Sequence, residues 1–135
     1  MFDHLGIVVS DLSKARGFYK PALATLGIKL LQENVMPDGD GWLVFTGEQP
    51  FPFFVVASGR PSYWGDDHAP SQSPAHIAFR ASSREAVDAF YTSCLEQGGA
   101  DNGKPGERPV AMGTYYAAYV IDPDGNNIEA GIRGP

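Results

Sequence analysis

Two histidines and one glutamate stand where this sequence could bind a metal ion. His4 and His76 each begin a short run of β-forming residues, and Glu129 lies within the last such run of the chain. Imidazole nitrogens and carboxylate oxygens are ordinary ligands of divalent transition metals, and two histidines with one carboxylate leave coordination positions open. Water, oxygen or a substrate could occupy those positions. The three residues therefore predict a metal site with room for a ligand.

The chain nearly repeats itself, and the repeat relates the two histidines. When residues 4–28 are moved along the sequence by 72 positions, they align with residues 76–100 without a gap, and six of the 25 pairs are identical. The identical pairs are His4/His76, Ser10/Ser82, Phe18/Phe90, Tyr19/Tyr91, Leu23/Leu95 and Gly27/Gly99. Two copies of one unit can be arranged about a pseudo-two-fold axis, which brings equivalent residues together. The duplication therefore predicts that the histidines are neighbours.

Each copy has the pattern of a strand, a helix and three further strands. The first strands are expected at 5–9 and 77–81, and helical spacing of apolar residues follows each of them. Ser82 precedes Glu85 by three residues, which is the spacing of a capping box at a helix start. Glycines at 27 and 98–99 suit the left-handed backbone that often ends a helix.

The remaining strands are expected at 28–32, 41–45 and 53–57 in the first copy, and at 115–121 and 127–132 in the second. The sequence Lys104-Pro105-Gly106 interrupts the strand that should follow the second helix. The pattern predicts one α+β domain of two β-α-β-β-β modules, with mixed sheets curled into an open barrel around a metal cleft. Module one is expected at 1–57, a linker at 58–75 and module two at 76–135.

Composition and charge exclude several classes of function. The 135 residues carry a net charge of −6 and a pI near 4.8, which disfavours binding to nucleic acid or to anionic membranes. No apolar run approaches the length of a membrane span, and the first residues carry no basic segment or cleavage site of a signal peptide. The single cysteine, Cys94, excludes an intrachain disulfide and is expected to be a packed thiol. A cytoplasmic protein is expected.

Three stretches resemble the vicinal oxygen chelate superfamily: DHLGIVVSDL near the start, HIAFRA in the middle and YYAAYVIDPDGNNIEA at the end. This superfamily includes glyoxalase I, extradiol dioxygenases, fosfomycin-resistance enzymes and bleomycin-resistance proteins. The resemblance covers essentially the whole chain. It implies paired β-α-β-β-β modules around a divalent metal such as zinc, nickel, manganese or iron. By position it implies that His4, His76 and Glu129 are the ligands, and that the metal holds two oxygens of a small-molecule substrate.

One departure from glyoxalase I concerns a fourth protein ligand, which those enzymes generally take from the last strand of the first module. At the 72-residue offset Glu129 corresponds to Ala57, and no shift of one or two residues supplies a carboxylate or imidazole there. The resemblance therefore implies three protein ligands. At this position the sequence also lacks the carboxylate that is a usual candidate for the proton-abstracting base of a glyoxalase.

Tyr119 and Glu129 are the candidate catalytic residues. Tyr119 precedes Glu129 by ten residues, the spacing of a tyrosine that supports the site of extradiol dioxygenases. The alternative is an aromatic residue that packs across strands with Tyr115 and Tyr116. His68, in the linker, could reach the site or lie in solvent.

Two hypotheses of different class follow. The first is a metal-dependent enzyme, of lyase, isomerase or dioxygenase type, acting on a small oxygenated substrate. The second is a bleomycin-resistance-like protein that binds a small molecule without turnover. A homodimer is expected in both cases, because small curved sheets with exposed edges are usually covered by pairing. The site could then lie within one chain or be shared by two, with His4 of one subunit meeting His76 and Glu129 of the other.

Overall fold

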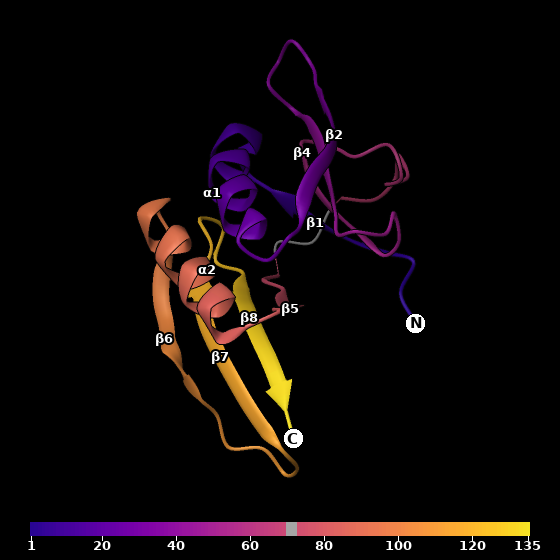
Figure 1. Ribbon diagram of the computed structural model, residues 1–135. Coiled ribbons are helices and arrows are strands. Elements are labelled where there is room, and N and C mark those ends of the chain that lie inside the picture. The colour runs from indigo at the N-terminus through magenta and orange to yellow at the C-terminus, as the bar shows by residue number, and fades with distance from the viewer. Residues whose placement is uncertain (70–72) are drawn as a thin grey trace.

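The chain folds as two β-α-β-β-β modules in sequence, as the computed structural model shows for residues 1–69 and 73–135 (Figure 1). The first module contains β1 (His4–Val9), α1 (Leu12–Ala24), β2 (Lys29–Val35), β3 (Gly41–Thr46) and β4 (Phe53–Ser58). The second contains β5 (His76–Arg80), α2 (Arg84–Glu96), β6 (Ala100–Glu107), β7 (Thr114–Ile121) and β8 (Asn127–Gly134). The predicted order of elements is confirmed in both copies.

Each module forms a four-stranded mixed sheet of the same topology. The strand orders are β1-β4-β3-β2 and β5-β8-β7-β6. In each sheet the first strand runs parallel to the last, while the other neighbours are antiparallel. The first strand is therefore an edge strand beside the last one, which places the start of β1 or β5 next to the strand that ends the module. The predicted α+β fold class is confirmed.

The two helices keep the spacing of the duplication, since both have 13 residues and begin 72 positions apart. Asp11 caps α1, because its side chain accepts a hydrogen bond from the backbone N–H of Lys14 at 2.9 Å. Ser83, rather than the expected Ser82, caps α2 by accepting from the N–H of Ala86. Glu85 therefore lies in the first turn but does not complete the predicted capping box. Neither helix of the described residues is long and apolar enough to cross a membrane.

The interruption predicted at 104–106 is accommodated by irregular pairing of β6. Its register with β7 shifts between Asp101 and Gly103 and again between Gly103 and Gly106. The extra residues bulge out while the strand continues, as β-bulges allow. The correspondence between the modules also changes, from 72 residues at the helices to 74 in the last strands, where Val55 and Glu129 hold matching places. The last strands must accordingly be aligned by their pairing and not by the sequence offset.

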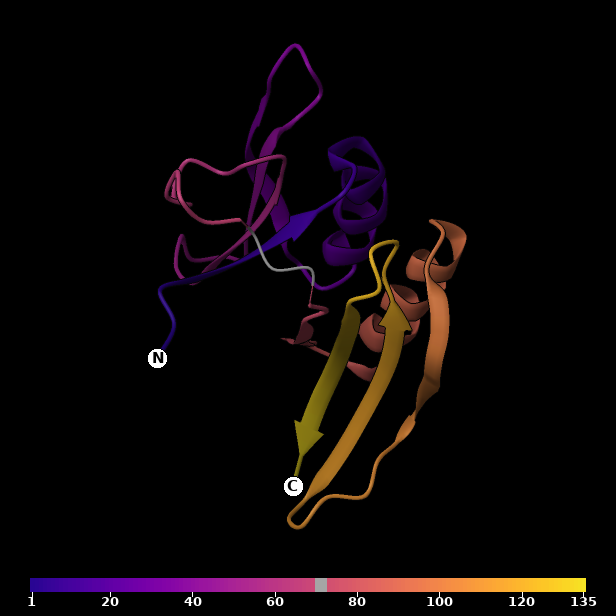
Figure 2. The ribbon, with the colours of Figure 1, turned by 180° about the vertical axis from the view of Figure 1, so that it is seen from behind.

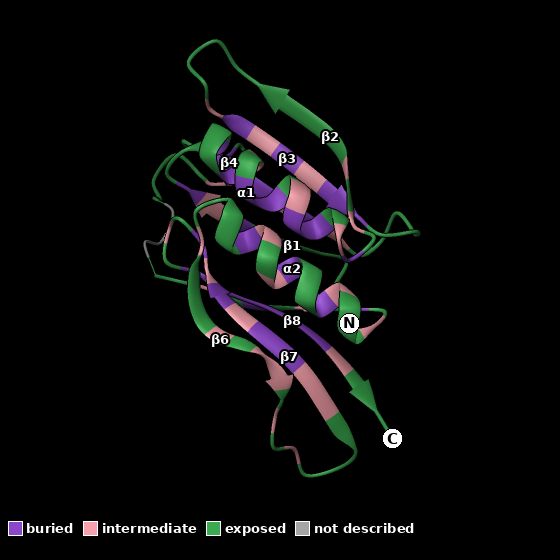
Figure 3. Ribbon diagram, turned by 60° about the vertical axis from the view of Figure 1, so that its left-hand side comes forward, coloured by how far each residue is buried: buried purple, intermediate pink, exposed green. Residues whose placement is uncertain are grey.

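The helices lie side by side between the two sheets, and the buried residues gather around them (Figures 2 and 3). Alternation along β3 shows how each sheet is divided, since Leu43 and Phe45 are fully buried while Trp42 and Val44 are half-buried. One face of each sheet packs on its helix and supplies the core. The opposite face of each sheet, which carries His4 in module one and His76 in module two, is not covered by α1 or α2 and is free for a site.

A polar cluster, buried at Tyr19 and Asp122 and exposed at Ser10, joins the turn between β7 and β8 to the first module. The Tyr19 hydroxyl of α1 donates to Oδ2 of Asp122, and the Ser10 N–H donates to Oδ1 of Asp124 at 2.9 Å. Burial raises the pKa of the Tyr19 hydroxyl, and the Asp122 carboxylate raises it further, so the hydroxyl stays protonated and donates. The Asp122–Gly125 turn thereby fixes the position of module two against α1.

Candidate metal and substrate site

His76 and Glu129 converge on the free face of the second sheet. Nε2 of His76 lies 3.2 Å from Oε2 of Glu129, although the residues are separated by more than 50 positions in the sequence. The pairing of β5 with β8 brings them together, because Ala78 is opposite Glu129 and His76 is two residues earlier on the same face. The Glu129 side chain is only 6% exposed, whereas that of His76 is 53% exposed. A buried carboxylate therefore sits beneath an accessible imidazole.

The protonation of His76 follows from its second contact. Nδ1 lies 3.1 Å from the backbone carbonyl oxygen of Asn127, and a carbonyl can only accept, so Nδ1 carries a proton. In the neutral imidazole the lone pair is then on Nε2, which faces the carboxylate. Two acceptors that face each other at this distance need a proton or a cation between them. The pair thus has the donor set and the orientation of a metal-binding histidine and carboxylate.

Tyr115 holds the other carboxylate oxygen, a contact that the sequence patterns did not reveal. Its hydroxyl donates a hydrogen bond to Oε1 of Glu129, and burial together with this bond raises the pKa of the hydroxyl. Tyr115 reaches Glu129 by crossing Gly131, where an added Cβ would lie 2.3 Å from the tyrosine oxygen. The signal that could have revealed the contact was this glycine, two residues after Glu129 in a strand.

Tyr119 lies directly opposite Glu129 in the β7–β8 pairing, so the two side chains share a face of the sheet. The Arg108 guanidinium stacks over the Tyr119 ring, with 5.2 Å from the guanidinium carbon to the ring centroid. The predicted catalytic candidate is therefore beside the carboxylate, although Tyr115 is the tyrosine that bonds to it. A role for Tyr119 stays a prediction.

His4 occupies the equivalent place on the first module, at the free face of the first sheet. Its Nδ1 is 2.6 Å from Oδ1 of Asp3, which accepts the Nδ1 proton and leaves the Nε2 lone pair available, as in His76. Its ring stacks on Phe53 with centroids 4.6 Å apart and planes 5° from parallel. Both histidines are thus oriented through Nδ1.

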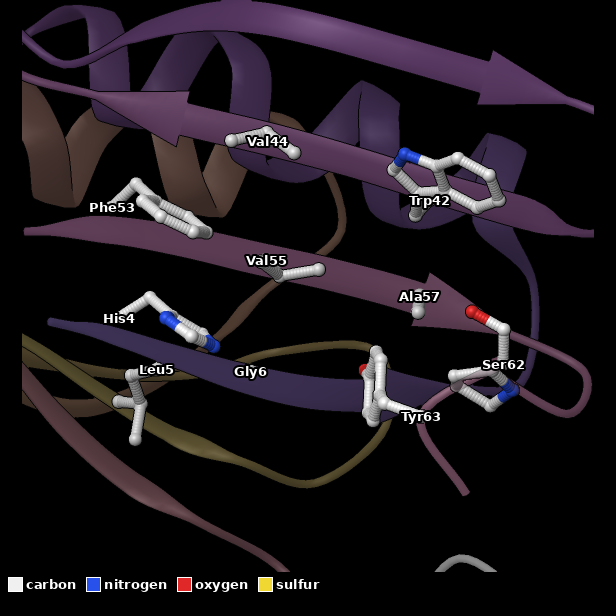
Figure 4. Close-up of a pocket in the computed structure, with 11 residues that line it drawn as sticks. His4, Leu5, Gly6, Trp42, Val44, Phe53, Val55, Ala57, Ser62 and Tyr63 are labelled. Atoms are coloured by element: carbon white, nitrogen blue, oxygen red, sulfur yellow. The ribbon is translucent and has the colours of Figure 1, made fainter. Parts of the chain in front are cut away.

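A mostly apolar cavity of about 460 Å³ extends from His4 across the first sheet. His4 and Phe53 lie at one end, and Trp42 and Tyr63 lie at the other (Figure 4). The floor between them consists of small and aliphatic residues, namely Gly6, Val44, Val55 and Ala57. The cavity has the size and lining of a small-molecule site.

The metal set predicted from the sequence stays a prediction. In the single chain His76 and Glu129 meet, but residues 1–69 and 73–135 hold no group of three His, Cys, Asp or Glu side chains that could bind a metal ion. His4 is accordingly separate from the pair within one chain.

The strand register corrects which residue of the first module corresponds to Glu129. Glu129 pairs with Ala78 of β5, and the equivalent residue of β1, Gly6, pairs with Val55. The counterpart is therefore Val55 and not Ala57, because the β6–β7 hairpin (residues 100–121) is longer than the β2–β3 hairpin (residues 29–46). Val55 also lines the cavity. The expectation that this position lacks a carboxylate also holds for Val55.

Two other sequence candidates lie away from the pair. Cys94 is fully buried in α2, and burial raises the pKa of its thiol to about 12, so it is a packed thiol as expected. His68 is exposed in the linker, where its carbonyl oxygen accepts a hydrogen bond from the Arg60 guanidinium at 2.7 Å. Neither lines the cavity beside His4.

Comparison with known proteins agrees with this architecture. The family model of the glyoxalase/bleomycin resistance protein/dioxygenase superfamily matches residues 1–130. A probable lactoylglutathione lyase of Synechocystis is 31% identical over 129 residues, covering 93% of this chain and 90% of the relative. A lactoylglutathione lyase of Neisseria meningitidis is 30% identical, with 93% and 86% covered.

Solved structures give the same result. The crystal structure of a glyoxalase/bleomycin resistance protein from Albidiferax ferrireducens is 31% identical, with a TM-score of 0.73 and 98% of both chains covered. A lactoylglutathione lyase from Agrobacterium tumefaciens, at 18% identity, a TM-score of 0.65 and coverage of 98% and 92%, shares the fold. The chain belongs to the glyoxalase/bleomycin resistance protein/dioxygenase superfamily.

Proposed function

We propose that this protein is a metal-dependent enzyme of the glyoxalase type, acting on a small oxygenated substrate that binds through two of its oxygens. His4, His76 and Glu129 would hold the divalent ion. The observation that carries the proposal is the approach of His76 Nε2 to Glu129 Oε2 at 3.2 Å, with Nδ1 of the imidazole committed to a carbonyl oxygen. A protein that only sequesters a ligand has no need of this arrangement.

We propose further that the site is completed by a second copy of the chain, in a homodimer. Apolar side chains beside His4 support this assembly: Phe2 is 67%, Phe51 59% and Leu5 41% exposed. The outer edges of β1 and β5 have no strand partner among the described residues, which leaves backbone groups open to pairing or covering. If the free face of one module meets that of the other module in a second subunit, His4 approaches His76 and Glu129 while the apolar surface is buried.

The residues of this site would have separate roles in the reaction. When bound, a divalent ion supplies Lewis-acid polarisation of the substrate oxygens. Trp42, Phe53 and Val55 would hold the apolar part of the substrate and exclude water from it. Tyr119, opposite Glu129, is the side chain that we assign to contact the substrate from the second module.

The relatives named lactoylglutathione lyase make that activity the first one to assay. Val55, however, supplies neither a fourth ligand nor a carboxylate base at the place where glyoxalase I enzymes are expected to have one. We therefore favour a reaction in which the substrate fills open coordination positions, as in the dioxygenase and fosfomycin-resistance branches of the resemblance. The second candidate, binding without turnover, is favoured by one feature, the aromatic and aliphatic lining of the cavity.

Metal content and subunit mixing test the proposal together. Protein purified without chelators should contain one divalent ion per chain by elemental mass spectrometry, and His4→Ala and Glu129→Gln should each abolish it. When the two variants are mixed and allowed to exchange subunits, a shared site predicts partial recovery, because each mixed dimer has one intact set of ligands. Sites within single chains predict no recovery. Metal-free protein that still binds aromatic molecules would support the second candidate instead.

A further inference from the structure

Glu129 has two carboxylate oxygens, and each has a different neighbour. Oε2 faces Nε2 of His76 at 3.2 Å, whereas Oε1 accepts the hydrogen bond from the Tyr115 hydroxyl. The carboxylate is buried, so neither contact is replaced readily by water. The orientation of the carboxylate is therefore set by the tyrosine on one side.

The placement of Tyr115 depends on two residues of β8. Gly131 provides the space, since a Cβ there would come within 2.3 Å of the hydroxyl oxygen and 2.6 Å of ring carbons. Arg133 covers the ring, with its guanidinium carbon 4.3 Å from the centroid, a favourable cation–π distance. Tyr115 is paired directly with Arg133, and its side chain leans along the strand to reach Glu129. The tyrosine is thus held in one conformation.

We propose that Tyr115 is a positioning residue that makes Glu129 a one-oxygen ligand. By engaging Oε1, it presents Oε2 alone toward His76 and toward the ion. The inference rests on the proposed metal site, which it deepens. Carboxylates bind metals through one or both oxygens, and a hydrogen bond to one of them decides between the two modes. A one-oxygen ligand leaves a further coordination position open for substrate.

Cobalt(II) added to the metal-free protein provides a readout that does not depend on turnover. Its visible absorption is strong in four-coordinate sites and weaker when a further oxygen binds. Tyr115→Phe should bind Co²⁺ about 10–100-fold more weakly, the usual cost of losing an outer hydrogen bond to a ligand. It should also give weaker visible bands, because Oε1 becomes free to bind.

Tyr116→Phe is the matched control. The neighbouring Tyr116 hydroxyl donates to Asp88 of α2 at 2.7 Å, on the opposite face of the sheet, so this variant should keep the wild-type spectrum and affinity. Gly131→Ala is the second test, because its Cβ displaces the Tyr115 hydroxyl without removing it. We expect Gly131→Ala to reproduce the spectrum of Tyr115→Phe. The two variants test the same contact, so either one suffices if the other does not fold.

The outcomes separate this inference from the proposed function. Wild-type Co²⁺ affinity and spectrum in both Tyr115→Phe and Gly131→Ala would overturn the positioning role and leave the metal site standing. If the wild-type protein binds no Co²⁺, the proposed metal site is wrong and the inference is wrong with it. A weaker, less absorbing Co²⁺ complex in both variants, and not in Tyr116→Phe, would support it.

Discussion

The free faces of the two sheets have diverged from a common plan into different surfaces. Both begin with a histidine whose Nδ1 is occupied and whose Nε2 is available. Beyond that point the first face is apolar, with Trp42 and Val55, whereas the second is polar, with Glu129. Val55 and Glu129 hold the same position in the two modules.

This difference has a physical consequence for any ligand between the faces. An apolar face contributes affinity in proportion to the area that it removes from water, while a buried carboxylate contributes only when a cation or donor compensates it. One face is therefore suited to hold the body of a substrate, and the other to fix its oxygens through an ion. Duplication made the scaffold symmetric, and substitutions at a few face positions made the site asymmetric.

The largest effect is expected when the second face is made like the first. Glu129→Val places the residue of module one in module two, and it removes both the carboxylate and the acceptor of the Tyr115 hydroxyl. Metal affinity measured by calorimetry should fall by more than the roughly 100-fold that loss of an outer partner costs. Glu107→Gln, which alters an exposed residue paired with Arg84, is the control and should bind normally. Unchanged affinity in Glu129→Val would remove Glu129 from the site.

The next largest effect concerns a tyrosine pair that the duplication preserves. Tyr19 is buried and bonds across the modules to Asp122, whereas its counterpart Tyr91 bonds within its own module to Asp101. Tyr19→Phe should lower the free energy of unfolding by about 1–3 kcal/mol, because Asp122 loses a buried donor. Urea denaturation measures this change, and Tyr91→Phe serves as the matched control with a smaller effect. Equal effects of the two substitutions would show that the Tyr19 hydroxyl, which bonds across the modules, stabilises the fold no more than the Tyr91 hydroxyl does.

The elements and the ligand candidates could be predicted because both follow from local pattern and duplication. Helical spacing around Phe18 and Phe90 and the polar turn at Asp122–Gly125 are local signals, and they identified the modules. The equivalence of Ala57 with Glu129 was wrong because the β6–β7 hairpin (residues 100–121) is longer than the β2–β3 hairpin (residues 29–46), so strand pairing and not the sequence offset sets which residues match.

The role of Tyr115 could not be predicted because it depends on a cross-strand approach over Gly131. Two adjacent tyrosines, Tyr115 and Tyr116, look alike in the sequence, yet one bonds to Glu129 and the other to Asp88. Whether a complete site takes His4 from a second copy depends on how the modules of two copies meet. That arrangement depends on surfaces brought together by folding, so no single segment of the sequence encodes it.

A moderate effect is expected from the reverse exchange, which makes the first face like the second. Val55→Glu places a carboxylate at the position equivalent to Glu129, on the floor of the cavity beside His4. Metal affinity should rise about tenfold, or about 1.4 kcal/mol, if the new carboxylate joins the shared site as a fourth ligand. Binding of an apolar probe such as toluene should weaken at the same time.

Val55→Gln is the control for Val55→Glu, because it has nearly the same shape without the charge. It should weaken the probe without improving the affinity for the metal. A gain in metal affinity with Val55→Gln, or none with Val55→Glu, would contradict the assignment of Val55 as the counterpart of Glu129 in a shared site.

The smallest effect is expected at the outer edge of the first sheet, away from both free faces. Arg16 of α1 donates from Nε to Oε2 of Glu33 in β2 at 2.8 Å, and this hydrogen bond lowers the pKa of Glu33. Because the folded pKa is below the unfolded one, the stabilisation is present in full above the ordinary pKa of a glutamate and is lost as the pH falls through the lowered value. Glu33→Gln should therefore lower the urea midpoint slightly at pH 7 and not at all in acid below that pKa. Glu96→Gln, which changes an exposed carboxylate of α2, should show no such dependence on pH. A Glu33→Gln effect that persists in acid would mean that side-chain packing, rather than the ion pair, ties β2 to α1.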